Sequence, residues 1–112
     1  MNQNWTKEFN AAITICSENG EILYMNDMSI KTFENDGGEK LIGKSLFDCH
    51  PQETNEKLKD MIINKKINCY TIEKNGIKKL IYQSPWYEEN ICKGIIELSI
   101  PLPVNLEHFI RD

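Results

Sequence analysis

The feature that most constrains the fold is the dipeptide Asn75-Gly76, which separates two segments with the composition of β-strands. Both residues tolerate positive φ angles, so the pair is a strong signal for a two-residue β-hairpin turn. Isoleucine and tyrosine recur in the segments on either side, residues 67–74 and 77–87. A similar segment, residues 91–102, follows a short polar turn. The last third of the chain is therefore predicted to be an antiparallel meander of three strands.

Two shorter strands and one longer helix are predicted before this meander. Residues 11–16 and 21–25 are apolar and flank a turn that contains Asn19-Gly20, which predicts a first hairpin. Asn26 follows it and is predicted to cap a short helix. Residues 51–65 are predicted to form the longer helix, because apolar side chains recur on one face at three- and four-residue spacing, namely Leu58, Met61 and Ile62.

The composition indicates a single globular domain. The chain has 112 residues, of which 40% are hydrophobic and 27% charged, and its net charge is −4. The acidic balance argues against a nucleic-acid partner, and no apolar run is long enough to span a membrane. The first residues do not form a signal peptide, so we expect a cytoplasmic protein whose four cysteines are reduced.

The order of the predicted elements resembles that of the PAS sensor domain. Local features that carry the resemblance are Asn26 after the second strand, "LIGKSLFD" before the longer helix, and "GIIE" at residues 94–97. The chain also resembles a PAS subgroup with Cys-His-Pro before that helix. The resemblance implies one α+β domain over residues 1–112, with a five-stranded antiparallel sheet and its helices on one face. Its parts are a helical cap (1–10), a core (11–101) and a tail (102–112).

The resemblance also implies a function. PAS domains often bind a small ligand between the long helix and the sheet, often dimerise, and pass a signal to another protein. We therefore expect a stand-alone sensor that binds a small ligand, forms a homodimer and relays its state to an unidentified signalling partner. The alternative is an interaction module with a filled core and no ligand. No sequence feature indicates an enzyme.

Strand alternation divides the meander into two faces. One face is predicted to point towards the longer helix and to form an apolar ligand pocket with it. A buried Gln83 there would need hydrogen-bond partners, because an unsatisfied amide is costly. The residues expected to line this pocket are Leu58, Met61, Ile62, Cys69, Thr71, Ile81, Gln83, Ile96 and Leu98.

The opposite face is predicted to be too apolar to stay in contact with water. Either a second copy of the chain covers it, or the N-terminal segment does, since Trp5 and Phe9 share one face of a predicted helix. The residues assigned to this face are Tyr70, Ile72, Leu80, Tyr82 and Trp86.

Cys49 and His50, just before Pro51, leave several interpretations open. Zinc would need three or four ligands, and a catalytic pair would need a third orienting group; neither is visible, and no metal site is predicted. Haem with Cys49 or His50 as ligand, non-covalent flavin, and a reactive thiol at a helix N-terminus remain open. The simplest interpretation is that the two residues pack and cap the helix that Pro51 begins.

Overall fold

The computed structural model describes residues 4–49 and 52–112, without the side chains of residues 48, 49, 52 and 54. Short helical pieces and one longer helix separate an N-terminal hairpin from a C-terminal meander. In chain order the elements are β1 (Ala12–Ser17), β2 (Ile22–Met25), α1 (Asp27–Thr32), η1 (Glu34–Asp36), η2 (Gly38–Leu41), α2 (Leu46–Cys49), α3 (Gln52–Asn64), β3 (Asn68–Lys74), β4 (Ile77–Glu88) and β5 (Ile91–Pro101).

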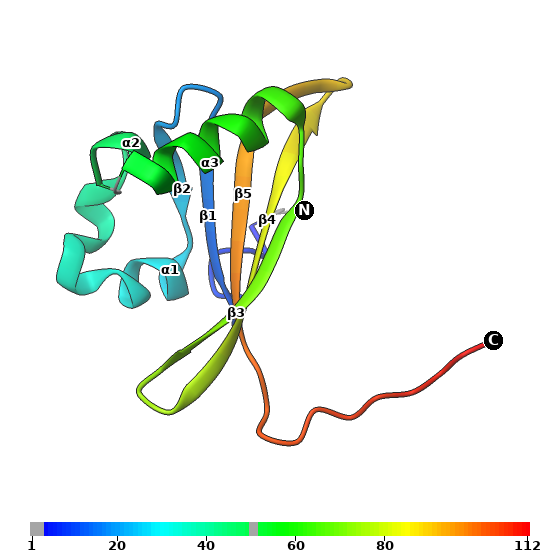
Figure 1. Cartoon of the computed structure of the whole chain (residues 1–112). Coiled ribbons are helices and arrows are strands. Elements are labelled where there is room, and N and C mark those ends of the chain that lie inside the picture. Colours follow the sequence, from blue (N-terminus) through cyan, green and yellow to red (C-terminus); the bar gives the residue numbers. More distant parts are fainter. Residues whose placement is uncertain (1–3, 50–51) are drawn as a thin grey trace.

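The five strands form one antiparallel sheet in the order β2-β1-β5-β4-β3. The helices lie on one face of this sheet, and α3 crosses it near its upper end (Figure 1). Leu58 and Met61 of α3 form a buried cluster with Cys16 of β1 and Ile95 of β5. The predicted α+β architecture, with its five-stranded sheet and helices on one face, is confirmed.

The predicted hairpin turn at Asn75-Gly76 is confirmed, and it fixes the register of β3 on β4. Both residues have positive φ angles, +53° and +78°, and Lys74 pairs with Ile77 on either side of them. Each residue of β3 therefore lies opposite the β4 residue at the same distance from the turn. Asn68 lies opposite Gln83 in this register, and directly opposed residues point to the same face of a sheet.

A β-bulge shifts the register of β4 on β5 by one residue. Tyr87 pairs with Cys92, whereas Trp86 pairs with Gly94, so Lys93 is the extra residue. Gly94 has a φ angle of +146°, and a Cβ atom there would lie 2.0 Å from the carbonyl oxygen of Cys16. The indole Nε1 of Trp86 donates to the same carbonyl at 3.0 Å. The bulge therefore requires glycine at position 94, because a side chain there would collide with the Cys16 carbonyl.

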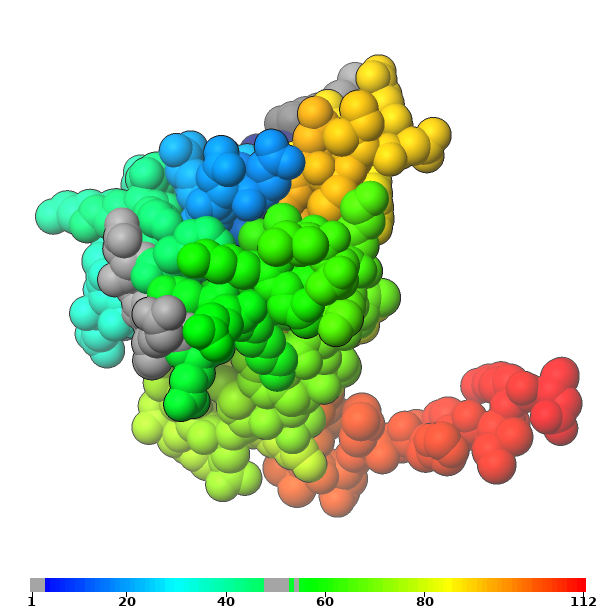
Figure 2. Space-filling view, turned by 45° about the horizontal axis from the view of Figure 1, so that its top comes forward, coloured from blue at the N-terminus to red at the C-terminus, as the bar shows by residue number. Residues whose placement is uncertain are grey.

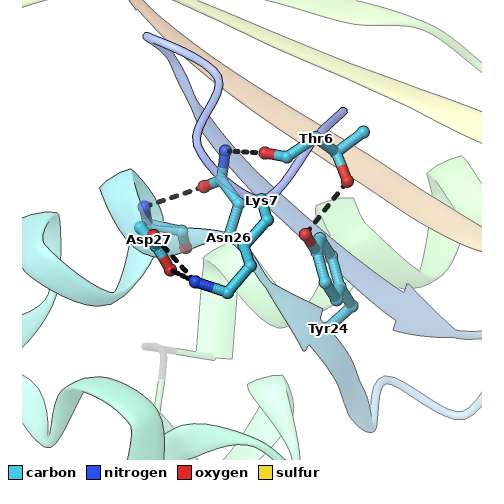
Figure 3. A network of polar contacts seen from close by, with 6 residues as sticks. Thr6, Lys7, Tyr24, Asn26 and Asp27 are labelled. Carbon is cyan, nitrogen blue, oxygen red and sulfur yellow. Dashed lines mark hydrogen bonds and ion pairs between the residues drawn. The ribbon is translucent and has the colours of Figure 1, made fainter. Parts of the chain in front are cut away.

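The buried side chain of Asn26 joins the N-terminal segment, β1 and α1 (Figure 3). Its Oδ1 accepts from the backbone nitrogens of Ile13 and Ser29, both at 2.9 Å, which confirms the predicted helix cap. Its Nδ2 donates to the carbonyls of Thr6 at 2.9 Å and Ala11 at 2.8 Å. One amide therefore satisfies four backbone groups at the end of the sheet.

The N-terminal segment departs from the prediction. Residues 5–8 form hydrogen-bonded turns instead of a continuous helix, with Lys7 and Phe9 donating to carbonyls only three residues back. The Thr6 carbonyl accepts from Phe9 within the turn and also from the side chain of Asn26. Trp5 and Phe9 pack edge to face, with ring centroids 5.7 Å apart, yet they stay 67% and 47% exposed.

We expect Gly94→Ala to destabilise the protein more than Gly43→Ala. Gly43 also has a positive φ angle, +92°, but a Cβ atom there would meet nothing within 4 Å. Gly43→Ala should therefore show only backbone strain, about 1–3 kcal/mol. Gly94→Ala should lose about 1–3 kcal/mol more, because the Cys16 carbonyl must move. Urea unfolding measures both, and equal losses would show that the contact of β5 with β1 is not tight.

Candidate ligand-binding site

A cavity of about 230 Å³ lies between α3 and the β3–β4 hairpin. Figure 2 shows α3 and β3, in green to yellow-green, side by side on the front of the molecule. The α3 side of the cavity is mainly apolar, whereas the strands contribute two amides and a phenol ring. Its lining residues are Lys57, Leu58, Met61, Asn68, Tyr70 and Gln83.

A chain of polar side chains crosses three adjacent strands beside this cavity; Asn68 and Gln83 line the cavity, whereas Glu97 lies behind Gln83 and is not one of the lining residues. Asn68 Nδ2 of β3 donates to Gln83 Oε1 of β4 at 3.0 Å, and Gln83 Nε2 donates to Glu97 Oε1 of β5 at 2.7 Å. An ionised carboxylate can only accept hydrogen bonds, so the nitrogen of Gln83 must face Glu97. The partners that a buried Gln83 was predicted to need are thus Asn68 and Glu97.

The negative charge of Glu97 affects the pKa of two neighbouring groups, the Tyr70 hydroxyl and the Cys16 thiol. Burial raises the pKa of the Tyr70 hydroxyl, and the negative charge of Glu97 raises it further. Burial also raises the pKa of the Cys16 thiol; a backbone hydrogen bond at Ile95 opposes this shift, and Glu97 adds to it. The carboxylate is therefore close enough to both groups for its charge to disfavour their ionised forms.

One cationic side chain stands at the edge of the cavity. Lys57 is exposed, and its Nζ lies 6.0 Å from the centroid of the Tyr70 ring. The site therefore combines a half-buried carboxylate on a central strand with an ammonium group exposed to water.

The structure brings together part of the predicted pocket. Leu58 and Met61 line the cavity, Ile62 packs against the same buried cluster, and Ile81 and Gln83 point from β4 towards the helices. That these residues bind a ligand stays a prediction.

The predicted facing of four other pocket residues is wrong. Cys69 and Thr71 lie opposite Tyr82 and Leu80, and Ile96 and Leu98 lie opposite Ser84 and Tyr82, all on the outer face of the sheet. The Asn75-Gly76 turn sets the β3 register, and the bulge before Gly94 moves Ile96 and Leu98 to the outer face. Their predicted roles in the pocket fail for this geometric reason.

The outer face differs from the prediction in the same way. Leu80, Tyr82 and Trp86 do lie on it, but Tyr70 and Ile72 point to the helix face, opposite Ile81 and Lys79. The apolar outer face of the two long strands is therefore formed by Leu80, Tyr82, Trp86, Ile96, Leu98 and Ile100.

Four residues of the site were missed from the sequence: Lys57, Asn68, Tyr70 and Glu97. Counting outward from the two-residue turn would have placed Asn68 and Tyr70 opposite Gln83 and Ile81. For Glu97 the only local signal was Gly94, since glycine within a strand often marks a bulge.

The other sites considered at the sequence level are partly outside the described structure. The side chain of Cys49 and all of His50 lie outside the described residues, so their proposed roles stay predictions. Among the residues that are described, no group of three or more metal-ligating side chains occurs. Within the same residues, no helix has both the length and the apolar character needed to cross a membrane.

A second hollow, of about 370 Å³, lies at the C-terminal end of α3. No chain of hydrogen-bonded side chains crosses it among the described residues. Its lining residues are Glu18, Ile62, Lys65, Asn90, Ile91 and Cys92.

Comparisons with known proteins place this geometry in context. A family model described as "PAS domain" matches residues 10–85. No curated protein matches the chain. Among solved structures, the PAS domain of the histidine kinase ThkA is 21% identical, with a TM-score of 0.65, and the match covers 82% of this chain and 99% of that one.

Two further structures share the fold at lower sequence identity. The Aer2 receptor from Vibrio cholerae, described as a dual PAS-heme oxygen sensor, is 10% identical with a TM-score of 0.62, over 83% of this chain and 95% of that one. VqmA bound to DPO is 14% identical with a TM-score of 0.65, over 88% of this chain and 55% of that one. At these identities the likeness shows the fold alone.

Proposed function

Because this chain belongs to the PAS domain family, we propose that it is a cytoplasmic sensor whose cavity under α3 binds a small molecule. The observation that carries the proposal is the cavity whose wall includes the hydrogen-bonded amides of Asn68 and Gln83, with Glu97 bound to Gln83 behind them. Ligand sites combine apolar walls with a few placed polar groups, and this site does so. Such a site binds and responds to a ligand; the groups around it do not suggest an enzyme.

The size of the cavity limits the ligand. Its volume of about 230 Å³ lies below the range of roughly 300–1,000 Å³ that is usual for drug-sized ligands. Haem and flavin nucleotides exceed this space, and none of the lining side chains is a histidine or a cysteine. The residues around the cavity thus fit a molecule of about one aromatic ring better than either cofactor.

The route to a partner protein would start at β5. This strand carries Glu97 and continues into residues 102–112, which extend away from the sheet (Figure 1). A ligand that binds one arrangement of β5 more tightly would shift the tail with it. The tail presents exposed apolar side chains to a partner, namely Val104, Leu106, Phe109 and Ile110.

Filling the cavity should abolish binding. In Leu58→Trp the indole would occupy the space beneath α3, whereas Ile63→Trp, on the solvent side of the same helix at 74% exposure, leaves the cavity open. We expect benzyl alcohol, followed by NMR titration, to bind the parent and Ile63→Trp but not a folded Leu58→Trp. If the parent binds no probe, and Leu58→Trp loses about 1–3 kcal/mol of stability from overpacking, the core is filled and the sensor proposal fails.

The outer face of the sheet favours a second proposal, a homodimer. Its middle, formed by Leu80, Tyr82, Ile96 and Leu98, is apolar and half-buried, and none of the helices in the described part of the chain lies on it. A second copy of the chain fits best, because two identical faces can pack their uncharged middles together through a two-fold axis and leave Glu73 and Lys78 near the hairpin tip outside the contact. This surface would also serve the alternative function, a ligand-free interaction module.

A charge on the outer face should separate the dimer. We expect light scattering at micromolar concentration to give a dimer for the parent and a monomer for Tyr82→Glu. Ile72→Glu, on the helix face of the neighbouring edge strand, is the matched control and should stay dimeric. A monomeric parent would remove the dimer proposal without affecting the cavity.

A further inference from the structure

The carboxylate of Glu97 lacks a cationic partner in the described part of the chain. It is half-buried on the central strand β5, and its neighbours on the helix face are Gln83 of β4 and Thr14 of β1. The ion pairs found among the described residues are Lys7–Asp27 and Lys66–Asp60, both on the surface. Burial of a charge costs free energy unless the charge is paired. A positive charge that comes close to Glu97 would offset this cost.

The groups that face Glu97 are neutral. Gln83 donates one hydrogen bond to it, and the hydroxyl of Thr14 is engaged with that of Ser29, 2.6 Å away. The Tyr70 hydroxyl and the Cys16 thiol are close enough to sense its charge, and both remain protonated at neutral pH. None of these four side chains can neutralise the carboxylate.

The polar chain also determines what the cavity offers to a ligand. Glu97 accepts a hydrogen bond from the Gln83 amide nitrogen, so the Gln83 oxygen faces Asn68. The amide nitrogen of Asn68 then donates to that oxygen. The oxygen of Asn68 and the second oxygen of Glu97 are left without a partner among the described residues. Asn68 lines the cavity and offers an acceptor there, while Glu97 adds a negative charge behind Gln83, so a ligand in the cavity should supply donors and positive charge.

From this arrangement we propose that the cavity prefers ring-sized ligands that carry an amine or another positively charged nitrogen donor, which the charge of Glu97 attracts from behind Gln83. The inference rests on the proposed function, since it names the class of ligand for the same cavity. Leu58, Met61 and the ring of Tyr70 supply the apolar surface for the rest of such a molecule.

Lys57 opposes this preference only weakly. Its ammonium group is exposed at the edge of the cavity, where water and salt screen it, whereas Glu97 is half-buried. The interaction with the inner carboxylate should therefore decide which charge the cavity accepts.

Three probes of nearly equal size test the proposal on the full chain: benzylamine, benzyl alcohol and benzoate. We expect NMR titration of the parent to show benzylamine binding about tenfold more tightly than benzyl alcohol, because the half-buried charge of Glu97 attracts the ammonium group at short range. Benzoate should bind least. In Glu97→Gln, which keeps the side-chain shape, benzylamine should lose this advantage, so that its affinity falls to about that of benzyl alcohol for the same variant.

The outcomes separate this inference from the proposed function. If benzyl alcohol or benzoate binds the parent as tightly as benzylamine does, the inference is overturned while the cavity remains a binding site. An unchanged benzylamine preference in Glu97→Gln would overturn it as well. If none of the three probes binds the parent, the proposed function fails and the inference fails with it. The comparison of probes on the parent needs no variant to fold.

Discussion

The close approach of Gly94 to the carbonyl of Cys16 is the constraint on which the site depends. Because Gly94 has no side chain, β5 can pair with β1 while it carries one extra residue relative to β4. The indole of Trp86 donates a hydrogen bond to the same Cys16 carbonyl. Beyond this point every residue of β5 is rotated to the face opposite the one it would otherwise take. Glu97 therefore lies under α3, opposite Gln83, and Ile96 lies on the outer face.

Much of the fold was predictable from the sequence, because it rests on local signals. The Asn75-Gly76 turn, the spacing of Leu58 and Met61, and the cap at Asn26 each act over a few residues, and the structure confirms them. The resemblance to PAS domains supplied the topology, and the family match confirms it. The N-terminal segment forms turns instead of the predicted helix, and its Thr6 carbonyl accepts both from Phe9 within the turn and from Asn26, twenty residues away.

The site was harder to predict, because it depends on how strands pair. The turn contained the information for β3: residues at equal distance from it face each other, which puts Asn68 and Tyr70 into the cavity. The β5 register did not follow from any turn, since the bulge inserts a residue within the strand. The predicted apolar pocket is therefore a cavity with a polar wall, and Glu97, to which the sequence analysis assigned no role, is the charged end of an amide chain behind that wall.

Asn68 and Gln83 form the polar wall of the cavity, with Glu97 behind them, and their side-chain amide protons report directly on a ligand bound there. The most direct measurement is the nitrogen–proton NMR spectrum of the full chain as benzylamine is added. The side-chain signals of Asn68 and Gln83 should move together and saturate, while the indole signal of Trp86, on the outer face, stays in place. If benzylamine moves the Trp86 signal and leaves those of Asn68 and Gln83 unchanged, the cavity under α3 is not the binding site.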